Sequence, residues 1–414
     1  MQSYYQKFNK EKLIKKIKSI KKQDGKFNNL EVEYVLDVLE NSKKKNVDYV
    51  KKIEDLFCKK FKVKYAIACN SGTSGLHAAM YSLGLKADDE VIVPGLAVVM
   101  DAYAVFHRGA KVVFCDVDPD TFLINYEEIK KKITNKTKAI ITVSLQGLPV
   151  DIDPIIKLAR KNNIKVVEDN AQDLYGVYKN RLSGFSGDIG VWSFENKKHL
   201  SGASEGGIIS TNNKRLAERI RKFAGIGYKN MTAIGGRTSL SIEEVQDPNY
   251  KRFDTIGLNY RMPQIVAAVA YSQLKNSKNI LKKRVASAKY FRNAIKNCRW
   301  LVEQKIPKHC KHSHYTFAVK FLTNKIKNKY TWKDIYKKYK EKGGDGFYGA
   351  CAPIYKEPSI KKYLKKKNYP KIKLNNVEKI QKQIMQFKTN YRDLNLAKKK
   401  ANILKKLIYE IDES

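Results

Sequence analysis

Residues 187–211 read GDIGVWSFENKKHLSGASEGGIIST, in which a polar, bend-rich segment separates two apolar runs. The runs IGVWSF (189–194) and GGIIST (206–211) are short and rich in apolar and β-branched residues, which is typical of buried strands. The segment between them carries two adjacent lysines, Lys197 and Lys198. The sequence therefore predicts two strands joined by a long polar turn that contains both lysines.

Five similar runs precede this stretch, and helical stretches separate most of them. The runs are YAIAC (65–69), EVIVP (90–94), KVVFCDV (111–117), AIITVSL (139–145) and KVVED (165–169). Alternating strands and helices favour a mostly parallel sheet that is covered by helices on both faces. We therefore expect an α/β fold for this part of the chain.

The flanking regions have a different pattern. Residues 1–60 show helical periodicity and predict polar helices, whereas residues 225–258 are rich in Gly, Thr, Ser and Asn and predict a long loop that leaves the sheet. A helix is expected to begin near Pro263, and the region beyond it predicts a smaller α+β domain. We expect two domains, residues 1–275 and residues 276–414.

The chain of 414 residues carries 82 Lys and Arg against 41 Asp and Glu, a formal net charge of +41. The lysines are spread over nearly every helical segment, so we attribute the charge to solvated helix faces and expect no nucleic-acid partner. No apolar run is long enough to span a membrane, and the N-terminus lacks the apolar core of a signal peptide. We therefore expect a cytoplasmic protein that does not bind membranes.

The cysteines and histidines do not predict a metal site. The six cysteines lie far apart with no C-x-x-C pair, and Cys69 and Cys115 fall in strand-like runs, where we expect buried thiols. His309, His312 and His314 cluster, but no nearby carboxylate or second cysteine completes a tetrahedral site. We expect these histidines to lie on the surface or at the rim of a substrate site.

Polar residues follow several of the predicted strands, and ligands of open α/β sheets bind beyond the carboxyl ends of strands. NSGTSG (70–75) ends one strand and opens a helix, so its N–H groups and the hydroxyls of Ser71 and Thr73 could bind an anion. A capped turn without a ligand would have the same sequence. Asp169 could cap a helix or pair with a protonated ring nitrogen. An anion site, a strand-end aspartate and a lysine on a polar turn are the parts that a pyridoxal-phosphate site needs.

These residues lie within longer segments whose order is informative. The chain resembles the DegT/DnrJ/EryC1/StrS family of sugar aminotransferases, which use pyridoxal phosphate and have the fold type I of aspartate aminotransferase. The resemblance covers about residues 25 to 410 and implies a large domain with a mostly parallel central sheet and a smaller C-terminal α+β domain. The segments that carry it are NSGTSGLHAA, DEVIVP, GAKVVFCDVDPDTFLI, VVEDNAQ, GDIGVWSFENKKHL, SEGGIIST and LNYRMPQIVAAVAYSQL.

The resemblance implies which lysine binds the cofactor. In the family a serine lies five positions before the Schiff-base lysine, and here Ser193 precedes Lys198 by that spacing, with Lys197 as the neighbouring alternative. Asp169 matches the partner of the pyridine nitrogen, and Gln172 matches the side chain near the ring hydroxyl. The resemblance thus implies that Lys198 and Asp169 are the catalytic residues.

Further residues match those that hold the cofactor's phosphate. Gly72, Thr73 and Ser193 match the phosphate-binding turn, and Asn259 matches a residue that reaches the phosphate of a neighbouring subunit. The resemblance therefore implies a homodimer with shared active sites.

Three features depart from the family pattern. Val98 stands where many members have an aromatic residue that stacks on the ring. The segment between Lys198 and the Glu-Gly-Gly is one residue longer than the commonest spacing in the family. We therefore expect the turn that carries Lys197 and Lys198 to bend differently from that of other members. The C-terminal segments 343–355 and 385–391 differ from those of the best-known members, which leaves the identity of the sugar open.

The resemblance implies a transaminase that moves an amino group, by family analogy from glutamate, to a keto sugar that is nucleotide-linked, in amino sugar and polysaccharide biosynthesis. A sugar dehydratase on the same scaffold stays an alternative if the longer turn shifts His199 into the lysine position. A cysteine desulfurase would need Cys351 as a mobile nucleophile. A binding or regulatory protein that keeps the scaffold without catalysis is the alternative from another class.

Overall fold

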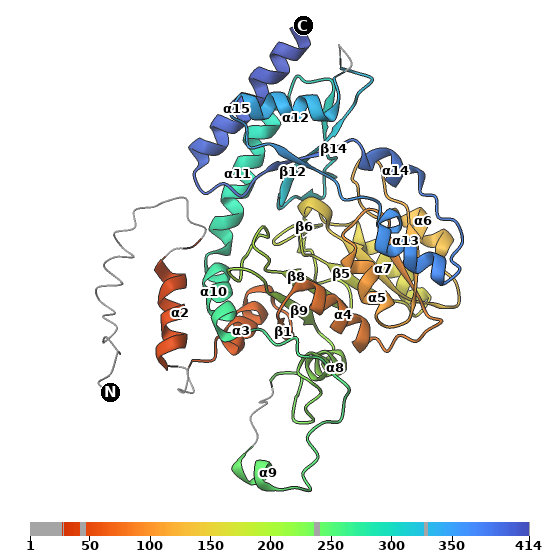
Figure 1. Ribbon diagram of the computed structural model, residues 1–414, viewed down its shortest axis with the longest axis vertical. Coiled ribbons are helices and arrows are strands. Elements are labelled where there is room, and N and C mark those ends of the chain that lie inside the picture. The colour runs from red at the N-terminus through yellow and green to blue at the C-terminus, as the bar shows by residue number, and fades with distance from the viewer. Residues whose placement is uncertain (1–26, 28, 42–46, 236–240, 327–329, 414) are drawn as a thin grey trace.

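The computed structural model describes residues 27, 29–41, 47–235, 241–326 and 330–413 (Figure 1). Its centre is a seven-stranded sheet in the order β1-β9-β8-β5-β4-β2-β3. The strands are β1 (Tyr65–Cys69), β2 (Glu90–Pro94), β3 (Lys111–Cys115), β4 (Thr137–Val143), β5 (Lys165–Asp169), β8 (Ile189–Ser193) and β9 (Gly207–Thr211). The expected α/β fold with a mostly parallel sheet is confirmed, because only β9 runs antiparallel to its neighbours β1 and β8.

The strand directions bring three distant segments to one edge of the sheet. Strands β1 and β8 are both antiparallel to β9, so they run in the same direction as each other and as β5. Cys69 and Ser193 both pair with Gly207, one from each side. The carboxyl ends of β1, β8 and β5 therefore meet at this edge, which is where open α/β sheets bind their ligands.

Helices pack against both faces of the large sheet. They are α2 (Asn29–Asn41), α3 (Tyr49–Phe61), α4 (Gly72–Ser82), α5 (Met100–Phe106), α6 (Tyr126–Lys132), α7 (Ile152–Lys161), α8 (Lys214–Ala224) and α10 (Gln264–Lys275), with a 3-10 turn η1 (Leu145–Gly147). Successive residues of a strand point to opposite faces, so Ile208 packs in the apolar cluster of α3 and α10 whereas Ile209 packs in the cluster of α4 and α8. Both faces of the sheet are thus buried, as expected for a parallel sheet.

A second sheet follows in the C-terminal part of the chain. Its order is β10-β12-β14-β13, and every pairing is antiparallel. The strands are β10 (Leu301–Glu303), β12 (Thr316–Phe321), β13 (Phe347–Gly349) and β14 (Ile384–Lys388), and the helices are α11 (Ser277–Ile295), α12 (Trp332–Glu341), α13 (Pro358–Lys366), α14 (Asn375–Gln381) and α15 (Leu394–Glu413), with η3 (Ile354–Lys356). Stacked rings of Phe291, Phe317 and Phe387 join α11 to this sheet. The proposed boundary between residues 275 and 276 stays a prediction.

The segment 225–258 leaves the sheet as expected. It projects from the body of the molecule and carries the short helix α9 (Ile242–Gln246), which the sequence reading missed (Figure 1). Several of its apolar side chains are exposed, with Ile256 at 93% and Ile242 at 71%, although Met231 and Ala233 are buried. Exposed apolar side chains that gather on one projecting segment are typical of interaction surfaces.

The helix expected within residues 30–40 is confirmed as α2, and that near Pro263 as α10, whose N-cap is Pro263. The helix expected at 12–22 lies outside the described residues. The sequence reading also missed a small three-stranded sheet of β6 (Val177–Tyr178), β7 (Arg181–Leu182) and β11 (Cys310–Lys311). Among the described residues, no helix has both the length and the apolar character that a membrane crossing requires.

Candidate active site

The turn at residues 70–75 begins α4 at the carboxyl end of β1. Ser71 caps this helix, because its hydroxyl oxygen accepts a hydrogen bond from the N–H of Ser74 at 3.1 Å. The Ser71 hydroxyl is therefore committed to the cap, which corrects the expectation that it is offered to an anion. A Cβ on Gly72 would lie 2.8 Å from the Cβ of Ser193, so only glycine permits this close approach. Thr73 is exposed at the start of the helix, where N–H groups suit an anion.

Asp169 is the last residue of β5 and is 4% exposed. Its Oδ1 accepts a hydrogen bond from the N–H of Ala171 at 2.8 Å. Burial raises the pKa of the Asp169 carboxyl group, while the Ala171 N–H and the amine of Lys198 act in the opposite direction. The structure thus places the buried carboxyl group of Asp169 near Lys198, the lysine that the family spacing indicates.

Gln172 follows in the same turn and is held by the 3-10 turn after β4. Its Oε1 accepts a hydrogen bond from the backbone N–H of Gln146 at 2.8 Å. The side chain of Gln146 in turn accepts one from the hydroxyl of Thr316 at 2.6 Å. This chain of contacts fixes the Gln172 side chain at the same edge of the sheet as Asp169.

The lysine turn, residues 194–206, connects β8 to β9. At its base, Phe194 donates its N–H to the carbonyl of Gly206 at 2.7 Å, and Gly202 donates to the carbonyl of Phe194 at 2.9 Å. These contacts close the turn just after Ser193, which lies beside Gly72. Ser193, Gly72 and the start of α4 therefore lie close together.

The two adjacent lysines have different surroundings. Lys197 is exposed, with its amine 5.8 Å from the ring centre of the exposed Tyr348. The amine of Lys198 is buried and lies 4.8 Å above the ring of Tyr315. Burial lowers the pKa of Lys198, and the positive charge of Arg284 adds to this, whereas Asp169, Glu195 and Cys351 oppose it. A lysine with a lowered pKa is more often neutral, so that its amine is available as a nucleophile or proton acceptor, and the geometry therefore favours Lys198.

His199 has a different environment. Its Nε2 lies 3.1 Å from the carbonyl oxygen of Ser313, and its ring is 5% exposed. Burial and the nearby charge of Arg284 place the pKa of His199 well below its ordinary value. His199 interacts with Ser313, Arg284, Tyr315 and other neighbours, whereas Asp169 interacts with Lys198, so the geometry favours the register in which Lys198 faces Asp169.

Arg284 of α11 was missed by the sequence reading. It is 2% exposed, and burial lowers the pKa of its guanidinium group to about 10. Its Nη2 donates to the carbonyls of Lys197 at 3.1 Å and Lys198 at 2.9 Å, and its Nη1 donates to the carbonyl of Tyr315 at 2.8 Å. Arg284 therefore holds the backbone of the lysine turn, and nothing in a lysine- and arginine-rich sequence distinguishes this residue in advance.

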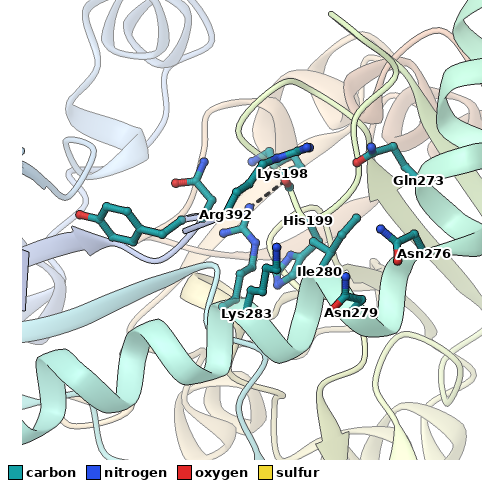
Figure 2. A pocket seen from close by; sticks show the side chains of 11 residues that line it. Lys198, His199, Gln273, Asn276, Asn279, Ile280, Lys283 and Arg392 are labelled. Atoms are coloured by element: carbon teal, nitrogen blue, oxygen red, sulfur yellow. Dashed lines mark hydrogen bonds between the residues drawn. The ribbon is translucent and has the colours of Figure 1, made fainter. Parts of the chain in front are cut away.

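A pocket lies beside the lysine turn, and Figure 2 shows Asn276, Asn279 and Lys283 projecting toward it from the α10–α11 stretch. Three cationic side chains other than Lys198 line it, and none of its lining residues is acidic. The lining residues are Lys198, His199, Gln273, Asn276, Asn279, Ile280, Lys283, Arg284, Asn390, Tyr391 and Arg392. Such a lining suits an anionic ligand.

Asn259 lies at the edge of the 70–75 turn of its own chain. Its backbone carbonyl accepts a hydrogen bond from the Asn70 side chain at 3.5 Å, and its Oδ1 accepts one from Arg261 at 3.1 Å. The side chain is exposed. Its expected contact with a neighbouring subunit stays a prediction.

The remaining candidates are placed as follows. Cys69 and Cys115 are buried, as expected, and Cys351 is exposed near Lys198. His314 is 5% exposed and stacks on His312 with ring centres 4.0 Å apart, so the expectation of a surface or site-rim position is wrong for His314. Within the ranges that the structure describes, no three His, Cys, Asp or Glu residues are grouped as metal ligands.

The residues at this edge fit pyridoxal phosphate. Gly72 leaves room beside Ser193 that any larger residue would fill, and Thr73 and the first N–H groups of α4 suit a phosphate. The buried amine of Lys198 and the buried carboxyl group of Asp169 lie near each other but do not form a direct ion pair. An amine for covalent attachment and an acid for a ring nitrogen are what the cofactor requires.

Comparison with known proteins identifies relatives of this chain. The model of the DegT/DnrJ/EryC1/StrS aminotransferase family matches residues 26–400. GDP-perosamine synthase of Escherichia coli O157:H7 is 35% identical over 268 residues, which are 64% of this chain and 68% of that protein. The crystal structure of an aminotransferase from Psychrobacter cryohalolentis is 26% identical, with a TM-score of 0.84 over 94% of this chain and 99% of that one.

A dehydratase shares the fold. The structure of E. coli GDP-4-keto-6-deoxy-D-mannose-3-dehydratase with bound hydrated pyridoxal phosphate has a TM-score of 0.78 and 24% identity, over 92% of this chain and 97% of that one. At that identity the likeness concerns the fold alone.

Proposed function

Because the chain belongs to the DegT/DnrJ/EryC1/StrS aminotransferase family and is a pyridoxal-phosphate enzyme, we propose that it transfers an amino group from glutamate to a keto sugar linked to a nucleotide. The observation that carries this proposal is the buried amine of Lys198 beside the buried carboxyl group of Asp169. The cofactor supplies an electron-withdrawing ring that stabilises negative charge on an adjacent carbon. The name of the E. coli relative supports a GDP-linked sugar as the first substrate to test.

We assign the holding of the cofactor to two groups of residues. Gly72, Thr73 and Ser193 bind its phosphate at the start of α4, where N–H groups point outward. Gln172 lies beside the ring, and Asn259 of a second subunit completes the phosphate site in a homodimer. The closeness of Gly72 to Ser193 supports the first assignment, and the exposure of Asn259 supports the second.

Lys198 moves the proton in this proposal. With the cofactor and the amino donor bound, the free amine of Lys198 would take a proton from the donor's α-carbon and would return it on the cofactor side. Its lowered pKa supports this role, because a neutral amine can accept a proton. Asp169 keeps its negative charge opposite the ring nitrogen and so holds a proton there.

The cationic pocket beside the lysine turn supports an anionic substrate. Lys283, Arg284 and Arg392 line it, and the carboxylates of glutamate and the diphosphate of a nucleotide sugar are both anions. Binding of such groups to Lys and Arg is favourable even at partly exposed sites. In this proposal, substrate binding therefore involves only a few of the many cationic side chains of the protein.

The test is a pair of half-reactions on the purified protein loaded with pyridoxal phosphate. Glutamate alone is expected to convert the cofactor to its amino form, with release of 2-oxoglutarate. A panel of GDP- and other nucleotide-linked 3-keto and 4-keto sugars is then expected to restore the original spectrum and to yield an amino sugar. Loss of a sugar hydroxyl without transfer of nitrogen would overturn the proposal in favour of a dehydratase.

A further inference from the structure

Asp101 is a buried acid that the proposed chemistry does not use. It is the second residue of α5, lies in the apolar stretch VVMDAYAV and is 0% exposed. Within the described part of the chain, no N–H or O–H group donates a hydrogen bond to either of its carboxyl oxygens. Asp101 therefore does not cap α5, and a fully buried acid without a donor requires another explanation.

The polar neighbours of Asp101 belong to the active site. Its carboxyl group lies close to the carboxyl group of Asp169 and to the amine of Lys198, which are the two charged groups that act on it. Two carboxylates have only acceptors, so they form a hydrogen bond only when one of them carries a proton. Two buried negative charges in contact would also repel each other strongly. We therefore expect the pair to hold at least one proton.

The surroundings decide which of the two acids carries this proton. Asp169 accepts an N–H from Ala171, and that bond favours its ionised form. Asp101 lacks any such donor, and burial together with the neighbouring Asp169 raises the pKa of the Asp101 carboxyl group well above its ordinary value. The proton is thus expected on Asp101.

We propose that Asp101 is a positioning residue whose protonated carboxyl group donates a hydrogen bond to Asp169, and so holds Asp169 ionised and in one orientation at the base of the lysine site. The proposal rests on the assignment of Asp169 in the proposed function. With Ala171 as a second donor, the Asp169 carboxylate is held from two sides, by its own turn and by α5. This leaves acceptor capacity on Asp169 for the ring nitrogen of the cofactor.

The first test uses the protein without cofactor and measures infrared absorption. At mildly alkaline pH, above the pKa of about 6 of the buried Asp173, the difference spectrum of wild type against each Asp101 variant is expected to show the carbonyl stretch of a protonated carboxylic acid; the difference cancels any band of Glu168, another buried acid whose pKa is raised by burial. Asp101→Asn and Asp101→Ala are expected to lack this band. The matched control is Asp116→Asn. Asp116 is likewise a buried aspartate, but its carboxylate accepts N–H groups from Val117, Asn376 and Val377, which favour its ionised form. This control is therefore expected to keep the band. Persistence of the band in both Asp101 variants would overturn the proposal.

The second test separates positioning from a purely structural role. In the loaded enzyme, Asp101→Asn keeps an N–H donor toward Asp169 and is expected to retain kcat within about threefold, whereas Asp101→Ala is expected to lose about tenfold or more, with the KM of both substrates nearly unchanged. Equal kcat values for the two variants would contradict the proposal, whether both are impaired or neither is. The infrared result does not depend on the cofactor, so it stands even if Asp169→Asn leaves turnover intact and thereby removes Asp169 from the mechanism.

Discussion

Two neighbouring lysines differ in one property that decides which of them reacts. The amine of Lys198 is buried over the ring of Tyr315 and faces Asp169, whereas Lys197 is exposed. We expect Lys198→Ala to bind pyridoxal phosphate without covalent attachment, because the amine that faces Asp169 is lost. The measurement is borohydride reduction of the loaded protein followed by peptide mapping of the labelled lysine. Lys197→Ala is the matched control and is expected to keep the label on Lys198; a label on Lys197 would move the assignment by one residue and revive the dehydratase.

The carboxyl group of Asp169 acts on both the cofactor and the lysine. We expect Asp169→Asn to retain bound cofactor, because the phosphate site is untouched, but to lose turnover by roughly a hundredfold or more, since a preorganised charge in a buried site is lost. Absorbance of bound cofactor and steady-state rates measure the two effects. Near wild-type turnover would leave Asp169 as a cap for the Ala171 N–H and no more.

The same substitution is expected to change the amine of Lys198 in the protein without cofactor. Asp169 raises the pKa of Lys198 against the lowering effect of burial. Removal of the negative charge in Asp169→Asn therefore lowers the pKa of Lys198 further, so that the amine is neutral, and reactive, at lower pH. The measurement is the pH dependence of acylation at Lys198 by mass spectrometry, with the exposed Lys197 as an internal reference. An unchanged or higher pKa would contradict the arrangement described here.

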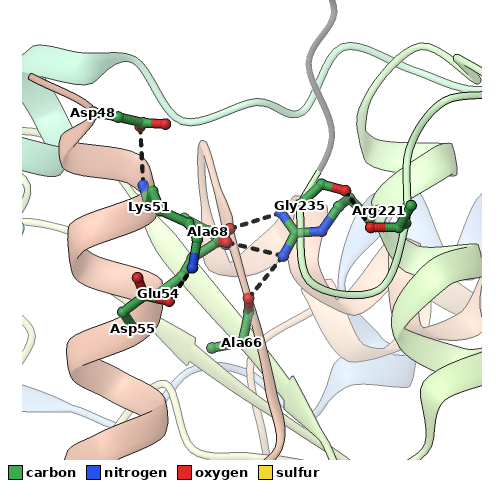
Figure 3. A network of polar contacts seen from close by, with 9 residues as sticks. Asp48, Lys51, Glu54, Asp55, Ala66, Ala68, Arg221 and Gly235 are labelled. Carbon is green, nitrogen blue, oxygen red and sulfur yellow. Dashed lines mark hydrogen bonds and ion pairs between the residues drawn. The ribbon is translucent and has the colours of Figure 1, made fainter. Parts of the chain in front are cut away.

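At the scale of elements, the buried ion pair of Glu54 and Arg221 joins α3, β1 and α8. Figure 3 shows Glu54 of α3 facing Arg221 of α8, with the backbone of Ala66 and Ala68 between them. The two N–O distances are 3.0 and 2.9 Å; Arg221 also donates to the carbonyl of Ala66, and Glu54 accepts the N–H of Ala68. This pair fixes β1, and with it the start of the 70–75 turn.

We expect Glu54→Gln to lower the free energy of unfolding by about 3–5 kcal/mol, because the Arg221 guanidinium would stay buried without its charge partner. Urea denaturation measures the effect. The exposed pair of Lys51 and Asp55 on the same helix offers the matched control, and Asp55→Asn is expected to change stability by less than about 1 kcal/mol. Equal effects of the two substitutions would show that the buried pair contributes no more than a surface one.

The strands of the large sheet could be predicted from the sequence, because short apolar runs between polar turns leave little choice of conformation. Asp169 and Lys198 could be located because each follows such a run. The pairs of residues that form β6 and β7 are too short to have a period, and α9 is a single turn of five residues in a polar loop. Arg284 and Asp101 were missed for a different reason: their roles depend on burial against segments more than sixty residues away in the chain, which spacing does not reveal.

At the scale of the whole molecule, we expect the 225–258 segment, several of whose apolar side chains are exposed, to contact a second subunit. If Asn259 reaches the neighbouring subunit's site, a dimer of Lys198→Ala with Asn259→Ala has one site with both lesions and one with neither. We therefore expect two inactive preparations to regain activity, up to about a quarter of wild type at equal mixing, after subunit exchange. The measurement is turnover with exchange followed by differently tagged chains. Full exchange without recovery would place Asn259 in the site of its own chain.

Arg284 links distant parts of the molecule through a single side chain. It donates to the carbonyls of the lysine turn, to the carbonyl of Tyr315 at the start of β12 and to the hydroxyl of Thr389 just after β14, at 3.3 Å. Any loosening of the four-stranded sheet therefore releases the backbone that carries Lys198. On heating, the visible colour of the bound cofactor should change before the circular dichroism of the large sheet is lost. The absorbance of the bound cofactor would thus report whether the C-terminal region is folded. Lysine has too few N–H donors for these acceptors, so Arg284→Lys should move the change in absorbance to a still lower temperature relative to the loss of circular dichroism.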